Sequence, residues 1–122
     1  MLAAMPTTAL PVLSPRERQA GGCCTPVVEP DLSAAGAEEL AVVVRALANP
    51  VRLRIVDALR NAAPEAICQC ELVPLFDMRQ QALARHLGVL AEAGVIGSER
   101  RGLWTYYHVK HDALEQLGTW LR

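Results

Sequence analysis

The sequence has no long apolar run and no excess of charge of one sign. Although 52% of its 122 residues are hydrophobic, no stretch reaches the roughly 18 to 20 apolar residues of a membrane-spanning helix. Twelve Lys and Arg against thirteen Asp and Glu leave a net charge of −1, which excludes a uniformly basic, histone-like protein. The opening MLAAMPTTALPVLS has two prolines and no basic residue, unlike an export signal. We therefore expect a cytoplasmic protein with one small folded domain.

The sequence also lacks the motifs of common enzyme sites. It has no glycine-rich phosphate loop, no pair of catalytic carboxylates and no Ser–His combination. The cysteine motif is Cys68-Gln69-Cys70, which differs from the Cys-x-x-Cys of disulfide oxidoreductases. Four cysteines in a cytosolic chain are more typical of metal ligands or redox groups than of structural disulfides. We expect a binding protein and not an enzyme.

Composition divides the chain near residue 31. Residues 1–31 contain five of the eight prolines, a Gly21-Gly22 pair and no apolar periodicity, so they cannot bury enough surface to offset the entropy of ordering. Residues 1–44 have two basic and five acidic residues, whereas residues 45–122 have ten basic and eight acidic ones. The sequence thus predicts a flexible N-terminal arm over residues 1–31, which carries Cys23 and Cys24, and a more basic folded domain over residues 32–122.

The first part of the folded domain is predicted to form two helices. Apolar residues recur at helical spacing over residues 33–48, until Asn49-Pro50 ends the run. Pro50 suits the first turn of a second helix, which ends near Asn61. The buried side of this second helix is predicted to contain Leu53, Val56, Ala58 and Leu59, with Ile55 as a further candidate.

Two further helices and a hairpin are predicted next. A short helix over residues 70–76, with Leu72, Leu75 and Phe76 as apolar contacts, precedes a longer one that begins at an Asp77–Gln80 capping box. Two helices joined by so short a turn indicate a helix-turn-helix. The longer helix has a stripe of Leu83, Leu87 and Leu90 and ends before Gly94.

After Gly94 the apolar period falls toward two, which is typical of strands. Val95 and Ile96 enter the first strand, Arg101-Gly102 forms the turn, and residues 104–109 return. A final helix over residues 112–121 follows, with Leu114, Leu117 and Leu121 on one side. The predicted fold is mainly α with a two-stranded β-wing, a winged helix-turn-helix.

The longer helix has the side chains that a DNA-recognition helix needs. Opposite its leucine stripe it presents polar and small residues, and Gln and Arg can pair with adenine and guanine edges in the major groove. Two arginines at the hairpin tip suit a phosphate or a narrow minor groove. His86 is predicted to support this face rather than to bind a metal. The candidate DNA-binding residues are Arg79, Gln80, Gln81, Ala84, Arg85, His86, Arg100 and Arg101. Each feature taken singly also fits solvated charges on an ordinary amphipathic helix and hairpin.

The stretch from Val44 to Val109 resembles the ArsR/SmtB family of metal-sensing winged-helix repressors. The resemblance rests on RALANPVRLRIVDAL, ICQCEL and ARHLGVLAEAGVIGSERRGLWTYYHV, which occur in the family's order and spacing and cover over half the chain. It implies a homodimer, formed by the first and last helices of residues 32–122, that binds a palindromic operator and leaves it when a metal or metalloid binds. One departure concerns the recognition helix. The family usually opens it with Ser-Gln-Pro and has a Ser near its middle, where this chain has Arg79-Gln80-Gln81 and Ala84.

The same resemblance points to the four cysteines as metal ligands. CQCEL is similar to the CxCDL element of arsenic- and cadmium-sensing members, although Val73 stands where some of them have a third cysteine. Cys23-Cys24 followed by Thr25-Pro26 resembles the N-terminal pair of actinobacterial-type arsenic repressors, whose arm reaches the partner subunit's site. The resemblance therefore implies a site formed by Cys68, Cys70, Cys23 and Cys24. Positions two apart on an ideal helix diverge by about 200°, so Cys68 and Cys70 can share an ion only if Cys68 lies in a frayed first turn.

The cysteines leave more than one function open. Soft thiolates favour thiophilic ions: three suit As(III) or Sb(III), and four suit Cd(II), Pb(II) or Zn(II). The principal hypothesis is an arsenite- or antimonite-responsive repressor, with a divalent-metal sensor and a thiol-redox switch as alternatives. Under the plainest alternative Cys70 is a small buried hydrophobe and Cys23 and Cys24 have no role. His108 and His111 are predicted to belong to the strand end and the helix start rather than to a metal site.

Overall fold

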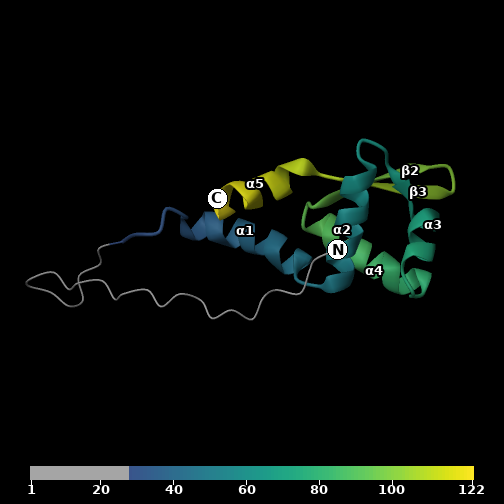
Figure 1. Ribbon diagram of the computed structural model, residues 1–122, viewed down its shortest axis with the longest axis horizontal. Coiled ribbons are helices and arrows are strands. Elements are labelled where there is room, and N and C mark those ends of the chain that lie inside the picture. The colour runs from purple at the N-terminus through teal and green to yellow at the C-terminus, as the bar shows by residue number, and fades with distance from the viewer. Residues whose placement is uncertain (1–27) are drawn as a thin grey trace, which may run out of the picture. The chain divides into compact units, whose positions relative to one another are not determined.

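The computed structural model describes residues 28–122, and the elements of this part are labelled in Figure 1. The helices are α1 (Ala34–Leu47), α2 (Pro50–Ala62), α3 (Gln69–Leu72), α4 (Gln80–Glu92) and α5 (His111–Leu121), with a 3₁₀ turn, η1, over Val73–Leu75. The strands are β1 (Ile67–Cys68), β2 (Ile96–Arg101) and β3 (Trp104–Val109). The predicted fold, mainly helical with a β-wing, is confirmed. Strand β1 was not predicted.

Side-chain caps determine where each of the first two helices starts. The Ser33 hydroxyl accepts a hydrogen bond from the Gly36 amide at the start of α1. At the start of α2, Asn49 Oδ1 accepts from the amides of Val51 and Arg52 at 2.9 and 3.1 Å, and Pro50 occupies the first turn, where its missing N–H costs nothing.

The buried face of α2 differs from the prediction at one position. Ile55, Val56 and Leu59 are buried, whereas the side chain of Leu53 is 52% exposed. Leu53 lies two residues before Ile55, and two residues of helix correspond to a rotation of about 200°. A stripe centred on Ile55 therefore leaves Leu53 facing outward.

The helix-turn-helix also starts differently from the prediction. The segment expected to be one helix over residues 70–76 is split into α3 and η1, because Pro74 has no amide with which to continue the helical ladder. Leu72 and Phe76 are buried as predicted, but Leu75 is exposed.

Helix α4 begins at Gln80 with Arg79 as its N-cap residue, and no side chain caps it. The predicted Asp77–Gln80 capping box is therefore wrong. The Met78 amide donates to the Phe76 carbonyl at 2.9 Å, and this tight turn moves the helix start two residues beyond the expected place. Leu83, Leu87 and Leu90 are fully buried, as predicted. Gly94, with φ of 77°, follows the end of the helix.

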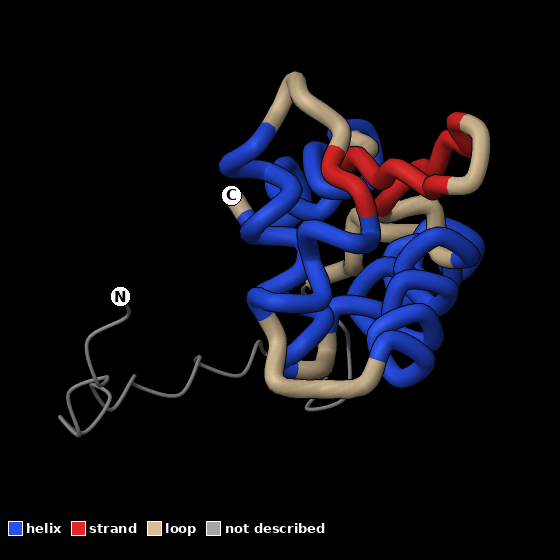
Figure 2. The backbone as a smooth tube through the Cα atoms, turned by 90° about the vertical axis from the view of Figure 1, so that its right-hand side faces the viewer, coloured by secondary structure: helices blue, strands red, loops and turns tan. Residues whose placement is uncertain are grey.

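The three strands form an antiparallel sheet in the order β1-β3-β2, which lies at one side of the helices in Figure 2. Arg101 pairs with Trp104 across a two-residue loop, and Gly102 takes the positive φ of 62° that such loops require. Cys68 pairs with Tyr106. The sheet thus joins the cysteine motif directly to the wing.

Helices α1 and α5 lie side by side, away from the sheet (Figure 1). Ala113, Leu114 and Leu117 of α5 are half-buried against the core, whereas other apolar side chains of the pair are exposed. These are Val42 and Val44 on α1 and Trp120 and Leu121 on α5. Leu121, predicted on the same side of α5 as Leu114 and Leu117, is 66% exposed in the single chain. Among residues 28–122, no helix has the length and apolar character to cross a membrane.

Candidate nucleic-acid interface and thiol site

One face of α4 is exposed to solvent and carries the side chains predicted to bind DNA. Arg79, Gln80, Gln81, Ala84 and Arg85 are all exposed. Gln80 and Ala84 are four residues apart, as are Gln81 and Arg85, so each pair lies on one side of the helix, and the buried leucine stripe takes up the other side. The amide and guanidinium groups of this face can donate and accept at base edges and phosphates.

The two wing arginines have different surroundings. Arg101 forms an exposed ion pair with Glu99 at 3.1 Å, and its guanidinium lies 4.6 Å from the centre of the Tyr106 ring. The hydrogen bond and the charge of Arg101 lower the pKa of Glu99. Arg100 instead donates from Nε to the Gly102 carbonyl at 3.2 Å. A phosphate that binds Arg101 has to compete with the Glu99 carboxylate. Among the described residues, Arg100 has no such ion pair, so its charge is more available to a phosphate.

His86 is half-buried on α4, and its Nδ1 lies 3.4 Å from Nη1 of Arg52 on α2. Arg52 also bonds the end of α1 through Nε, which donates to the Ala46 carbonyl at 2.6 Å. The apolar pattern of the second helix places Arg52 outside its buried side or at the edge of it. No periodicity reveals this contact, since Arg52 and His86 are 34 residues apart in the chain.

Cys68 and Cys70 meet at the start of α3. Cys68 is the N-cap residue, and its Sγ accepts a hydrogen bond from the Cys70 amide at 3.3 Å. The Glu71 carboxylate in turn accepts from the Cys68 amide at 3.3 Å, which completes a capping box. The Cys68 side chain is only 2% exposed, whereas Cys70 is exposed.

This geometry changes two expectations about the thiols. Cys68 has φ of −65° and ψ of 142°, so its backbone is extended and the divergence expected on an ideal helix does not apply to it. A side-chain hydrogen bond with Cys68 raises the pKa of Cys70 above its ordinary value, and the charge of Glu71 adds to the effect. The Cys68 sulfur therefore lies against the backbone of Cys70. The interpretation of Cys70 as a buried hydrophobe is wrong, because Cys68 is the buried one.

The other two predicted ligands, Cys23 and Cys24, lie outside the described residues. Within residues 28–122, no group of three or more His, Cys, Asp or Glu side chains is arranged to hold a metal ion. The part of the chain that the structure describes thus offers two neighbouring soft ligands, and a three-coordinate site needs a third from elsewhere.

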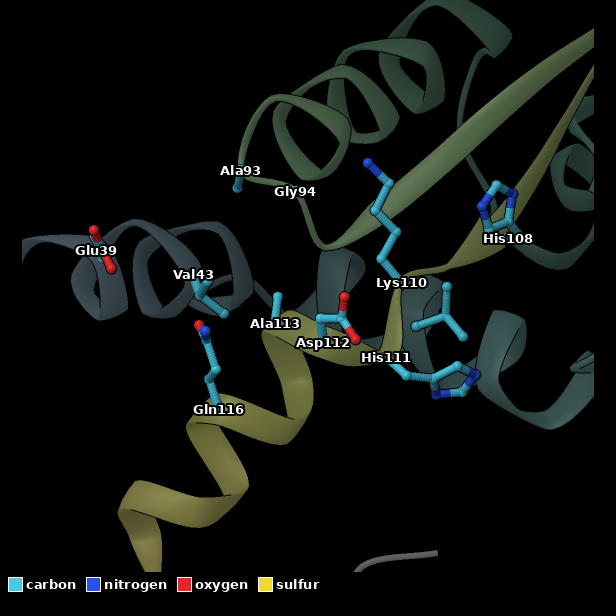
Figure 3. A pocket seen from close by; sticks show the side chains of 11 residues that line it. Glu39, Val43, Ala93, Gly94, His108, Lys110, His111, Asp112, Ala113 and Gln116 are labelled. Atoms are coloured by element: carbon cyan, nitrogen blue, oxygen red, sulfur yellow. The ribbon is translucent and has the colours of Figure 1, made fainter. Parts of the chain in front are cut away.

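A pocket of about 680 Å³ lies between α1, the end of α4 and the start of α5 (Figure 3). Its titratable lining residues are Glu39, His108, Lys110, His111 and Asp112. In Figure 3 these side chains are spread around the pocket and do not converge on one point. His108 lies in β3 and His111 begins α5, as predicted.

Comparison with known proteins identifies the domain. A family model described as a helix-turn-helix domain matches residues 47–98. The arsenical resistance operon repressor of Bacillus subtilis is 33% identical over 73 residues, which cover 60% of this chain and 68% of that protein. The arsenic resistance transcriptional regulator ArsR1 of Pseudomonas putida is 35% identical over 68 residues, and the match spans only 52% of that protein and 56% of this chain.

A solved structure extends the similarity to the fold. It is a homodimeric winged helix-turn-helix DNA-binding domain from Mycobacterium bovis, described as a possible ArsR-family transcriptional regulator. It is 26% identical, with a TM-score of 0.60, and the match covers 78% of this chain and 87% of that domain. The chain therefore belongs to the ArsR family of transcriptional regulators, which are winged helix-turn-helix DNA-binding proteins and not enzymes, as the sequence predicted.

Proposed function

We propose that the chain is an arsenite- and antimonite-responsive repressor that binds operator DNA as a homodimer and leaves it when cysteine thiolates bind As(III). The observation that carries this proposal is the pair of neighbouring thiols at the start of α3, directly before the recognition helix α4. Relatives named as arsenical resistance repressors support it.

The proposed ligands are Cys68, Cys70 and at least one of Cys23 and Cys24. We propose that residues 1–31 act as an arm that brings the third thiolate to the pair. Three thiolates match the coordination of trivalent arsenic and antimony. A site with all four cysteines would suit Cd(II), Pb(II) or Zn(II), and a disulfide among them would make a redox switch.

Ligand binding at Cys68 is expected to affect the helix-turn-helix through the cap of α3. The Cys68 sulfur is the acceptor for the Cys70 amide, so a bound ion competes with the capping box. Leu72 of α3 belongs to the same core cluster as Leu83 and Leu87 of α4. A change at the start of α3 can thus be transmitted to α4 through packed side chains. A coupling of about 1 to 3 kcal/mol would weaken operator binding about 5- to 150-fold.

A titration of operator-bound protein distinguishes the alternatives. The operator is obtained by selecting duplexes from a random library with the full chain, and release is followed by fluorescence anisotropy with arsenite, antimonite, cadmium and hydrogen peroxide. Release by arsenite and antimonite at the lowest concentrations supports the proposal. Release by cadmium alone favours the four-cysteine site, and release by peroxide alone favours the redox switch.

We further propose that the exposed face of α4, with His86 beside it, reads the operator and that Arg100 and Arg101 bind its backbone. Replacing Gln80 or Gln81 with alanine should cost about 1 to 3 kcal/mol of operator binding and relax sequence preference. Replacing Arg100 should weaken binding to all duplexes. It should also reduce the slope of log affinity against log salt concentration by about 1, which corresponds to the loss of one phosphate contact. Arg101 should show a smaller effect, because Glu99 already pairs with it.

Binding of the selected operator and of a random duplex at several salt concentrations checks this division of roles. If the Gln80 and Arg100 variants lose the same affinity on both duplexes, Gln80 has no base-reading role. The operator sequence itself is expected to differ from those of relatives with Ser-Gln-Pro at this place.

The homodimer is proposed to form through α1 and α5. Four large apolar side chains of these two helices remain exposed in the single chain, namely Val42, Val44, Trp120 and Leu121. Trp120 and Leu121 are adjacent at the end of α5, and exposed large apolar side chains of this kind are typical of an interface. The homodimeric domain from Mycobacterium bovis supports the formation of a dimer.

A further inference from the structure

We propose that Arg52 is a positioning residue that holds the recognition helix against the end of α1, through His86, and so couples the dimerisation helices to the DNA-binding face. The inference rests on the proposed DNA-binding and dimerisation functions. It assigns to Arg52 a role in operator affinity although Arg52 lies on α2, outside the exposed face of α4.

The first part of the contact is with α1. Arg52 Nε donates to the Ala46 carbonyl at 2.6 Å, and Nη2 donates to the Arg45 carbonyl at 3.4 Å. Both carbonyls are in the last turn of α1, where carbonyl groups carry partial negative charge, and the Arg45 carbonyl also accepts from the Ala48 amide at 3.3 Å. The Arg52 amide is itself held by Asn49 Oδ1 at 3.1 Å. The short Nε bond therefore fixes the guanidinium plane relative to α1 and α2 together.

The second part of the contact is with α4. Nη1 of Arg52 lies 3.4 Å from His86 Nδ1. A guanidinium has only donors, so Nδ1 must be the acceptor and the neutral ring must carry its proton on Nε2. Arg52 thereby selects both the tautomer and the orientation of His86, and leaves the Nε2–H as a donor at the other side of the ring.

The shape of the guanidinium is what makes this a coupling element. Its donors are held in a rigid planar fork, so one side chain connects three helices with little freedom. A shift of α1 relative to α4 must break either the Ala46 or the His86 contact. Arg54, two residues further along α2, has no such position, because its guanidinium lies over the Phe76 ring at 5.1 Å.

A double-mutant cycle tests the coupling. We expect Arg52→Gln to weaken binding of the selected operator about 5- to 50-fold, while sedimentation still shows a dimer. In a His86→Ala background, Arg52→Gln should cause no further loss. Arg52→Lys should not rescue binding, since an ammonium cannot span the three acceptors. Arg54→Gln is the matched control, which should bind as the original chain does. Additive losses, or equal losses for the Arg52 and Arg54 variants, would overturn the proposal.

A second measurement determines the tautomer of His86 in the original chain. In the full chain, ¹⁵N spectra of the histidine rings should show His86 Nδ1 unprotonated and Nε2 protonated at neutral pH, with the signal assigned by its loss in His86→Ala. A protonated Nδ1 would overturn the inference. If the original chain selects no duplex at all, the DNA-binding proposal fails instead, and the tautomer measurement still decides whether Arg52 holds His86.

Discussion

A chain with serine in place of Cys70 should bind operator DNA as tightly as the original chain and yet remain bound at arsenite concentrations about tenfold or more higher. Cys70 is exposed, so the substitution removes a ligand without opening a cavity. Because As(III) then loses one of the two thiolates at the start of α3, the bound state loses stability and the release curve shifts. Anisotropy of labelled operator during arsenite addition measures this shift. An unchanged release curve would remove Cys70 from the site.

Cys68 requires a control, because its sulfur also caps α3. Serine is a good N-cap residue, whereas alanine has no acceptor. Cys68→Ser should therefore lose the arsenite response and keep its stability, while Cys68→Ala should lose both, with a free energy of unfolding lower by about 0.5 to 2 kcal/mol. Comparing urea unfolding of the two variants separates the capping role from ligation.

Placing glutamate at both Trp120 and Leu121 should convert the dimer to a monomer and reduce operator binding toward the non-specific level, about 1000-fold weaker or more. These side chains are 54% and 66% exposed in the single chain, so a charge there costs little in the monomer. In a dimer the same charges would be buried against apolar groups of the partner, which is strongly unfavourable. Sedimentation velocity measures the assembly state, and anisotropy measures operator binding.

Leu114 and Leu117, which the sequence places on the same side of this helix, are less suitable for the test. They are half-buried against the core of their own chain, so charges there would also destabilise the fold. Leu75→Glu is the matched control for the assembly state, since Leu75 is similarly exposed and belongs to η1, directly after α3. In Figure 1, α3 lies away from the α1 and α5 pair. A dimer that survives the Trp120 and Leu121 changes would show that another surface forms the interface.

The sequence predicts most of the fold because its helices have clear apolar stripes and stop signals. Leu83, Leu87 and Leu90 are buried as their spacing requires. The errors arise where local patterns are ambiguous. Leu53 and Ile55 fit a helix stripe equally well, and only packing decides between them. The Asp77 cap is a valid local signal that the Phe76–Met78 turn overrides, and β1 is too short, at two residues, to show alternation.

The candidate site is less accessible to sequence reasoning, because its contacts join residues far apart. The exposed residues of α4 follow from periodicity, and the cysteine motif is visible directly. The burial of Cys68 and its role as the cap of α3 cannot be read from the sequence, since cysteine is an unusual N-cap residue. The Glu99–Arg101 pair could have been anticipated, because residues two apart on a strand share a face. The contact of Arg52 with His86 has no local signal.

The participation of the arm is the central claim about induction, and deleting residues 1–25 tests it most directly. Arsenite is added to operator-bound full chain and to operator-bound truncated chain, and the concentration that releases half of the DNA is compared. Ligation by Cys23 or Cys24 predicts equal operator affinity before arsenite is added and a clearly higher half-release concentration for the truncated chain. Release of both chains at the same arsenite concentration would contradict it, and would show that the third ligand of Cys68 and Cys70 does not come from the arm.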